Sequence, residues 1–371
     1  MIPSPPRRLR VVVCGTTFGR IYLRGLALLP DLFEVVGVIA RGSPASRAVA
    51  RAQGVPLYPD PASLPPSGID AACVVVRAGV VGGAGTELAR ALLERGIAVL
   101  QEHPVHHDEL AACLQAARRG GAAYRLNSFY PDVAPVARFI ATARRLLAAR
   151  APVYLDATCS VHVLFPLLDI LGRALGRLRP WSLSTAGDRG AGPFTSLDGT
   201  LAEIPFALRV QNEIAPADPD NHAHLLHRIV LGSTAGTLTL TDTHGLVLWS
   251  PRLHVPRDDL GQLAMFAPDP ALAQPSTAVI GPAAAAGCDA IFTSLWPEAV
   301  ARALRRFHAA VVSGTDDPAL TQAQLATCRL WQEIGRRLGP PRLIAPPPPQ
   351  PLALAGIAPR DTIKDGTACP A

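Results

Sequence analysis

The first 150 residues alternate short apolar runs with segments of helical periodicity, and this alternation constrains the fold more than any other feature. We predict strands at residues 9–14, 33–40, 69–76, 97–101 and 124–127. Helices are predicted between them at residues 18–29, 43–53, 86–95 and 108–119. This rhythm is typical of an α/β domain with a parallel sheet, in which each helix connects one strand to the next.

The turn after the first strand reads Cys-Gly-Thr-Thr-Phe-Gly, and we predict that it binds a nucleotide. It departs from Gly-x-Gly-x-x-Gly, because threonines stand between the two glycines, and a glycine turn can also serve packing alone. Its place between a strand and a helix favours binding, since backbone N–H groups and the helix dipole there can hold a pyrophosphate. The predicted contact residues are Gly15, Thr16, Thr17, Phe18 and Gly19.

The end of the second predicted strand indicates the type of nicotinamide cofactor. NAD-binding domains place an acidic residue there, whereas NADP-binding domains place arginine and small hydroxyl residues. Here the strand is followed, without any acid, by Arg41, Gly42, Ser43 and Arg47. These residues favour a pocket for a 2′-phosphate over a merely solvated loop, and therefore NADPH over NADH. Two further residues that follow strands complete the predicted cofactor-binding set, Arg77 and Glu102.

The rhythm changes near residue 153. A strand at 153–158, a helix at 161–175 and alternating stretches that include 225–231, 237–241 and 246–249 predict an α+β domain with a largely antiparallel open sheet. Helical patterns follow at 297–312 and 321–338. We therefore expect a nucleotide-binding domain at 8–150, a substrate domain at 151–338 and a Pro-rich tail at 339–371 that is extended or disordered.

Composition excludes several classes of protein. Of 371 residues, 49% are hydrophobic and 17% charged, which is typical of a globular protein. No apolar run approaches the roughly 20 residues of a membrane span, and the N-terminus is a poor signal peptide, so we expect a cytoplasmic protein without a membrane partner. The seven scattered cysteines indicate reduced thiols. The net charge is +6, and many of the arginines lie on predicted helix faces without interleaved aromatic residues, which disfavours nucleic-acid binding.

Several motifs together resemble the thiazolinyl imine (imide) reductases of siderophore biosynthesis. They are VVVCGTTFG (11–19), IARGS (39–43), GGAGT (82–86), VLQEHPVH (99–106), NSFYP (127–131) and LDILGRALG (168–176). The resemblance covers roughly residues 9–338 and implies NADPH-dependent reduction of a thiazoline ring to a thiazolidine. It implies that the substrate is tethered by a thioester to a carrier domain of a nonribosomal peptide synthetase that makes a yersiniabactin- or pyochelin-type product. It also implies the glucose–fructose oxidoreductase fold, with a Rossmann domain first.

The resemblance places the proposed proton donors of these enzymes at His103 and Tyr130. Reduction of a cyclic C=N bond needs a hydride on carbon and a proton on nitrogen, and both side chains can supply a proton. A structural role is the alternative for each residue: His103 as a hydrogen-bonding residue at a strand end, and Tyr130 as the cap of a turn. Asp169 is expected to orient substrate or to pair with Arg173, and His162 is a weaker substrate candidate.

The alternative function is a sugar or polyol dehydrogenase of the same fold. That group commonly ends a strand in Glu-Lys-Pro and carries His-x-x-Asp on a later helix, but here His103 replaces the lysine and Pro166 the histidine. A non-catalytic NADP-binding regulator is a third reading, which the retention of His103 and Tyr130 disfavours. The cluster His222, His224 and His227 lacks the spacing of a zinc helix, so we expect no metal. A homodimer is the assembly that we would test first.

Overall fold

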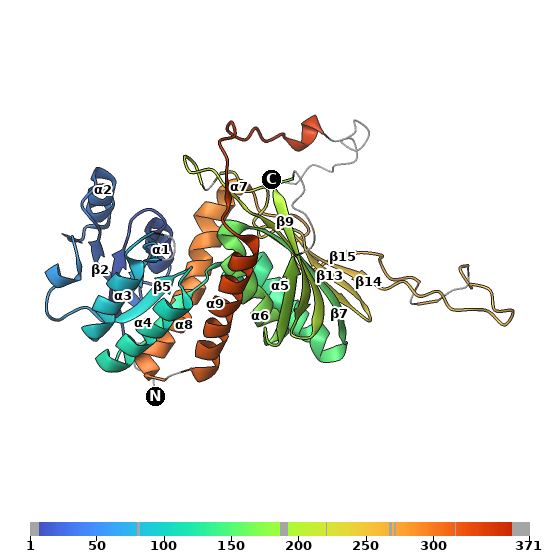
Figure 1. The fold of residues 1–371 in the computed structure, drawn as a ribbon, viewed down its shortest axis with the longest axis horizontal. Helices are drawn as coiled ribbons and strands as arrows, with labels where there is room; N and C mark the ends of the chain where they lie inside the picture. The colour runs from blue at the N-terminus through green and yellow to red at the C-terminus, as the bar shows by residue number, and fades with distance from the viewer. Residues whose placement is uncertain are drawn as a thin grey trace.

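The structure is a computed structural model that describes residues 7–79, 82–185, 192–219, 221–266, 269–270, 272–315 and 317–357. It contains two large sheets, with helices packed around the first and along one side of the second (Figure 1). Long helices from the C-terminal third of the chain lie between the two sheets (Figure 1). The predicted combination of a parallel Rossmann-type domain and an α+β domain is confirmed.

The first sheet has six strands, and every adjacent pair is parallel. Its spatial order is β3 (Leu57–Tyr58), β2 (Phe33–Ile39), β1 (Leu9–Cys14), β4 (Ala71–Val74), β5 (Ala98–Glu102) and β6 (Tyr124–Asn127). The connecting helices are α1 (Gly19–Ala27), α2 (Pro44–Gln53), α3 (Gly85–Glu94) and α4 (His107–Gly120). The chain order reverses between β1 and β4, and ligands of open α/β sheets bind beyond the carboxyl ends of the strands at such a point.

The second sheet has eight strands and is antiparallel except for the pairing of β10 with β7. Its spatial order is β15 (Ala278–Val279), β14 (Val247–Pro251), β13 (Gly236–Leu240), β12 (His227–Ser233), β7 (Pro152–Ser160), β10 (Ile204–Gln211), β9 (Phe194–Leu201) and β8 (Trp181–Thr185). Helices α5 (Ala134–Ala149) and α6 (Leu164–Leu175) pack against it. Alternation explains the one-sided packing, since Leu155, Ala157 and Cys159 of β7 are buried while Tyr154 and Asp156 are exposed.

The last helices connect the two sheets. A short helical stretch, α7 (Cys288–Ala290) and η5 (Ile291–Leu295), leads into α8 (Trp296–Ser313), and α9 (Pro318–Leu338) follows. Helix α8 packs on α1 so closely that a Cβ on Gly25 would lie 2.6 Å from Val300 Cγ1. Helix α9 packs on α4 and α6. No helix in the described ranges is both long and apolar enough to span a bilayer.

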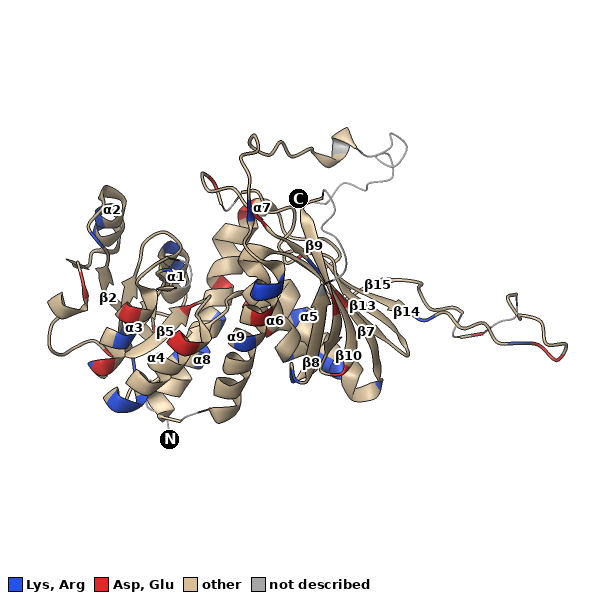
Figure 2. Ribbon diagram, viewed as in Figure 1, with Lys and Arg blue, Asp and Glu red and all other residues tan. Residues whose placement is uncertain are grey.

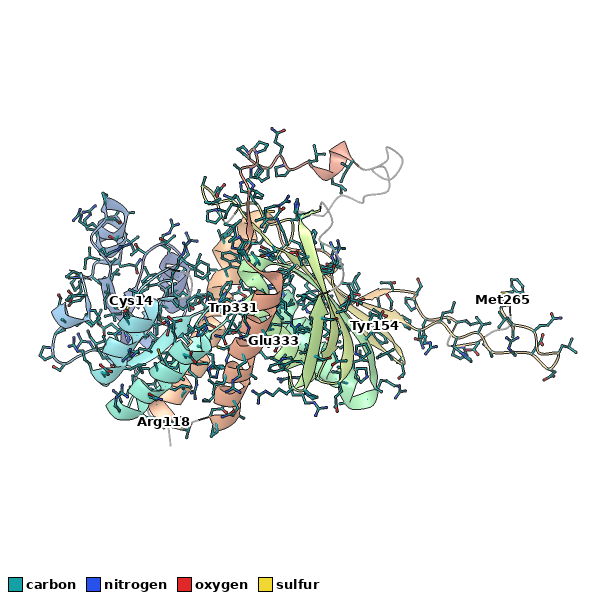
Figure 3. All side chains as sticks on the ribbon, viewed as in Figure 1. Cys14, Arg118, Tyr154, Met265, Trp331 and Glu333 are labelled. Atoms are coloured by element: carbon teal, nitrogen blue, oxygen red, sulfur yellow. The ribbon has the colours of Figure 1, made fainter. Side chains whose placement is uncertain are left out.

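Two segments extend beyond this body. The described residues between β14 and β15 form an arm that projects from the sheet edge and carries Met265 (Figures 1 and 3). In the predicted tail, β16 (Arg342–Leu343) pairs in parallel with β11 (Glu213–Ile214), a contact that the sequence analysis did not anticipate. The predicted tail bounds beyond residue 357 lie outside the described residues.

Candidate active site

The glycine turn lies at the carboxyl end of β1, the strand that ends at Cys14 (Figure 3). Gly15 has φ +89°, and a Cβ there would lie 2.4 Å from the carbonyl oxygen of Val75, so only glycine fits. Helix α1 begins at Gly19, and its N-cap residue Phe18 makes no side-chain capping hydrogen bond. Thr17 is exposed beside it. The N–H groups of the first helical turn therefore lack a side-chain cap, as a phosphate site requires.

The four residues predicted to select NADPH surround the start of α2. Ser43 caps this helix, because its hydroxyl accepts a hydrogen bond from the Ser46 N–H at 3.1 Å. Arg47 reaches back over the loop, since its Nη1 would lie 3.6 Å from a Cβ placed on Gly42. Arg41 and Arg47 are exposed, and neither guanidinium has an ion-pair or hydrogen-bond partner among the described residues. The geometry leaves two cationic groups available for an anion beyond the carboxyl end of β2.

Arg77 lies in the loop after β4, where its backbone has a structural role. Its carbonyl oxygen accepts a hydrogen bond from the Gly85 N–H at 2.7 Å, which brings the start of α3 close to the strand end. A Cβ on Gly83 would lie 2.2 Å from the same oxygen, so this tight loop needs glycine. The Arg77 side chain is exposed, and its contact with a cofactor stays a prediction.

The carboxyl ends of β5 and β6 hold a buried network of polar side chains. Glu102, the last residue of β5, accepts a short hydrogen bond through Oε2 from the hydroxyl of Tyr22, which belongs to α1. Asn127, the last residue of β6, donates from Nδ2 to the same hydroxyl at 2.6 Å. We call these three side chains the Tyr22 network. It connects the strand ends to the helix that follows the glycine turn.

His103 follows Glu102 directly, and its peptide bond to Pro104 is cis. Its backbone N–H donates to Asn127 O at 3.0 Å, which continues the pairing of the two strands. Its Nδ1 lies 2.9 Å from Glu102 Oε1, within ion-pair distance, although the angle does not meet hydrogen-bond geometry and Nδ1 has no other described partner. The two side chains are only 9% and 11% exposed.

Tyr130 follows a strained turn. Phe129 has φ +62° and ψ −63°, and the Tyr130 N–H donates to Ser128 O at 2.7 Å, which forms a γ-turn of the rare positive-φ type. Such strain persists only where surrounding contacts fix it. Here Asn127 Oδ1 accepts from the Phe129 N–H at 3.2 Å, and the buried Asp132 forms an ion pair with Arg306 of α8 at 2.5 Å. The turn that presents Tyr130 is thus fixed from both sides.

The two predicted proton donors lie together. The ring centroids of His103 and Tyr130 are 6.2 Å apart, and we call these two residues the donor pair. Phe165 of α6 stacks on the His103 ring at 5.8 Å, and Trp296 of α8 contacts Tyr130 edge to face at 6.4 Å. Phe18 of the glycine turn lies 5.7 Å from Trp296. A continuous set of rings therefore connects the predicted cofactor turn to the donor pair.

His227 also contacts Tyr130, at 5.1 Å, but it is a structural residue. Its Nε2 donates to the Val163 carbonyl oxygen at 2.9 Å, so Nδ1 is left to accept from the Thr243 hydroxyl at 2.8 Å. Burial lowers its pKa to about 3, which keeps the ring neutral. Across the described ranges, no group of three or more His, Cys, Asp or Glu side chains has metal-binding geometry.

Asp169 and His162 are the two weaker substrate candidates. Asp169 Oδ2 accepts from Arg173 Nη2 at 2.8 Å and from the hydroxyl of Ser128, so the predicted pairing with Arg173 is confirmed. Together with Phe165, Asp169 also lines a small pocket between α6 and α9. His162 is exposed and precedes Val163, the residue that binds His227. Substrate contact by either residue stays a prediction.

The residues that support the site were not predicted from the sequence. Tyr22 lies one helical turn after Phe18, but its partners Glu102 and Asn127 are about 80 or more residues away in the chain. Trp296 was assigned to no predicted element. Only the position of Tyr22 on the buried face of α1 gave a signal, and that signal indicates a core residue.

Two family models match successive parts of the chain. The model described as "Oxidoreductase family, NAD-binding Rossmann fold" matches residues 9–128. The model described as "Thiazolinyl imine reductase Irp3-like, C-terminal" matches residues 150–250. Both matches agree with the resemblance seen in the sequence motifs. No curated protein matches the chain.

Solved structures show the same fold at low identity. A levoglucosan dehydrogenase in complex with NADH and levoglucosan has a TM-score of 0.64 at 11% identity, covering 90% of this chain and 97% of that one. The WlbA dehydrogenase from Bordetella pertussis, in complex with NADH and UDP-GlcNAcA, has a TM-score of 0.63 at 13% identity and coverages of 91% and 97%. UDP-N-acetylglucosamine 3-dehydrogenase GnnA from Acidithiobacillus ferrooxidans has a TM-score of 0.62 at 15% identity and coverages of 90% and 100%.

Proposed function

We propose that this chain, an oxidoreductase of the NAD-binding Rossmann-fold family, reduces the C=N bond of a thiazoline ring with NADPH. The observation that carries the proposal is the position of the donor pair. His103 occupies the strand end where the sugar dehydrogenases of this fold carry lysine, and Tyr130 lies beside it. The match of residues 150–250 to the Irp3-like reductases supports the same substrate class.

The residues at the first sheet fit a nicotinamide dinucleotide phosphate. The uncapped start of α1 and the close approach at Gly15 suit a pyrophosphate, and Arg41 and Arg47 suit a 2′-phosphate. No acidic side chain follows β2 to bind the ribose hydroxyls. When bound, the reduced cofactor supplies the hydride that the ring carbon receives.

The chain's own contribution is to supply a proton to the ring nitrogen. As hydride reaches the carbon, negative charge develops on nitrogen, and a nearby acid lowers the barrier by transferring its proton there. His103 and Tyr130 lie close enough together for one to act and the other to orient the ring or support the transfer. Phe165 and Trp296 give this region apolar walls, which exclude water and suit a sulfur-containing ring.

We propose that the substrate arrives as a thioester on a carrier domain of a nonribosomal peptide synthetase that makes a siderophore. Carrier domains are generally acidic, so the rim of the crevice is expected to be basic. Positions of basic and acidic residues are interspersed along the helices in the ribbon of Figure 2. The dependence of the reaction rate on salt tests whether the carrier domain docks by electrostatic attraction. Reduction of carrier-bound substrate should slow as salt rises, while reduction of a small free thioester should change little. Equal responses to salt would contradict electrostatic docking.

The experiment that tests the reaction compares two substrate classes. The protein is mixed with NADPH and an aryl-thiazoline thioester, and the absorbance of NADPH is followed. A parallel sample contains NAD⁺ or NADP⁺ with sugars and polyols. We expect NADPH to be consumed only with the thiazoline, and no reduction of either oxidised cofactor. Oxidation of a sugar without reduction of the thiazoline would instead establish a sugar dehydrogenase.

A further inference from the structure

Tyr22 contacts one residue that supports His103 and one that supports Tyr130. Through Glu102 it reaches His103, because the second carboxylate oxygen of Glu102 lies 2.9 Å from His103 Nδ1. Through Asn127 it reaches the turn before Tyr130, because the amide oxygen of Asn127 accepts from the Phe129 N–H. One phenol on α1 therefore connects the cofactor-binding helix to both candidate acids.

The direction of each hydrogen bond in this network is determined. Burial, and next the Glu102 carboxylate, raise the pKa of Tyr22 well above 10, so its hydroxyl keeps its proton. That single proton is donated to Glu102 Oε2, since Asn127 Nδ2 can only donate to the phenol oxygen. Asn127 is thereby oriented with its oxygen toward the Phe129 N–H. Glu102 Oε1 stays free to face the imidazole.

The position of Oε1 determines which His103 nitrogen can hold a proton. Nδ1 is buried and has no described hydrogen-bond partner, and Glu102 Oε1 is the carboxylate oxygen beside it. A carboxylate there favours a proton on Nδ1 and leaves Nε2 to exchange the catalytic proton. The stacked Phe165 limits rotation of the ring away from this arrangement.

We propose that Tyr22 is a positioning residue for imine reduction. It holds the Glu102 carboxylate against His103 so that Nδ1 carries a proton, and it holds Asn127 so that the γ-turn presents Tyr130. The kinetic part of this inference rests on the proposed function, whereas the structural part concerns His103 itself and can be tested without substrate.

Tyr124 offers a matched control. Like Tyr22, it is a buried tyrosine whose hydroxyl bonds to a β5 side chain, donating to Gln101 Oε1 at 2.9 Å. Tyr124 belongs to a second hydrophobic cluster, separate from the one that contains Tyr22. Tyr22→Phe and Tyr124→Phe therefore each remove one buried hydroxyl, but only the first removes a contact to the proposed support of the donor pair.

The experiment measures both variants in two ways. The imidazole ¹⁵N signals of His103, assigned with His103→Gln, report which nitrogen is protonated, and steady-state kinetics with a thiazoline thioester report turnover. For Tyr22→Phe we expect loss of the Nδ1-protonated signature and a kcat lower by about 10- to 100-fold, with the NADPH Kd and substrate KM little changed. For Tyr124→Phe we expect wild-type ¹⁵N signals and turnover.

An unchanged ¹⁵N pattern in Tyr22→Phe, or equal kinetic losses in the two variants, would overturn the inference. If Tyr22→Phe does not fold, Glu102→Gln tests the same support, because it removes the charge from His103 while keeping the shape, and it should change the ¹⁵N pattern in the same way. If the wild-type protein does not reduce the thioester, the proposed function fails, and the ¹⁵N comparison still decides the role of Tyr22.

Discussion

The two unpaired arginines at the start of α2 give a quantitative prediction of cofactor preference. Arg41 and Arg47 are exposed, so each contact with a 2′-phosphate is screened by water and stabilises binding at the low end of charge-assisted hydrogen bonds, about 1.5 kcal/mol. That energy corresponds to about a tenfold change in Kd. Arg41→Ala and Arg47→Ala should each weaken NADPH binding about tenfold, and the double variant about 100-fold if the contacts are independent.

The assay is titration of cofactor fluorescence at fixed ionic strength, with NADPH and NADH in parallel. Arg51→Ala is the matched control, because Arg51 is exposed on the same helix one turn beyond Arg47. It should leave both Kd values within about twofold of wild type. NADH binding should change little in every variant, since NADH has no 2′-phosphate. Equal losses for NADPH and NADH, or a loss in Arg51→Ala as large as in Arg47→Ala, would refute the assignment.

Three further predictions concern the site and its surroundings. His103→Ala and Tyr130→Phe should each lower kcat by about 100- to 10,000-fold while NADPH still binds; full activity in both would place the acid elsewhere. His227 has a folded pKa of about 3, below its unfolded value, so the unfolded chain binds the extra proton and stability falls as the pH drops below about 6.5. Between about pH 7.5 and pH 5, the free energy of unfolding measured with urea should fall by about 2 kcal/mol more in the wild type than in His227→Gln. Identical pH dependence in the two proteins would contradict the buried neutral ring. Burial raises the thiol pKa of Cys14, whereas Cys288 is exposed. Alkylation followed by mass spectrometry should therefore label Cys288 in the native protein and Cys14 only after unfolding; native labelling of Cys14 would contradict its burial.

The first domain was predictable because its signals are local. Five of its six strands are predicted as short apolar runs, and helices α2 and α4 end at glycines with positive φ, Gly54 and Gly121. The two-residue edge strand β3 was not predicted, because it is too short to give a pattern. The second sheet was harder to bound. Strands β8, β9 and β10 mix polar and apolar residues because one face is solvent-exposed, and their bounds were not predicted.

The proximity of the two candidate proton donors could be predicted from the sequence, whereas the contacts that support them could not. His103 and Tyr130 both follow strand ends of a parallel sheet, and the carboxyl ends of such strands meet at one edge, so their proximity follows from topology. The contacts of Tyr22 with Glu102 and Asn127 depend on how α1 rotates against two strands that come much later in the chain. No periodicity in the sequence encodes that rotation. The γ-turn at Phe129 was equally hidden, because a bulky residue at positive φ runs against local preference.

The proposed reaction transfers a hydride from NADPH to the carbon of a thiazoline C=N bond. The most direct measurement uses NADPH deuterated at the transferable position with a carrier-bound aryl-thiazoline, followed by release and mass spectrometry of the product. We expect a thiazolidine with one deuterium on the ring carbon, and no such product from Tyr130→Phe/His103→Ala. An unreduced thiazoline, or a thiazolidine without deuterium, would contradict the account.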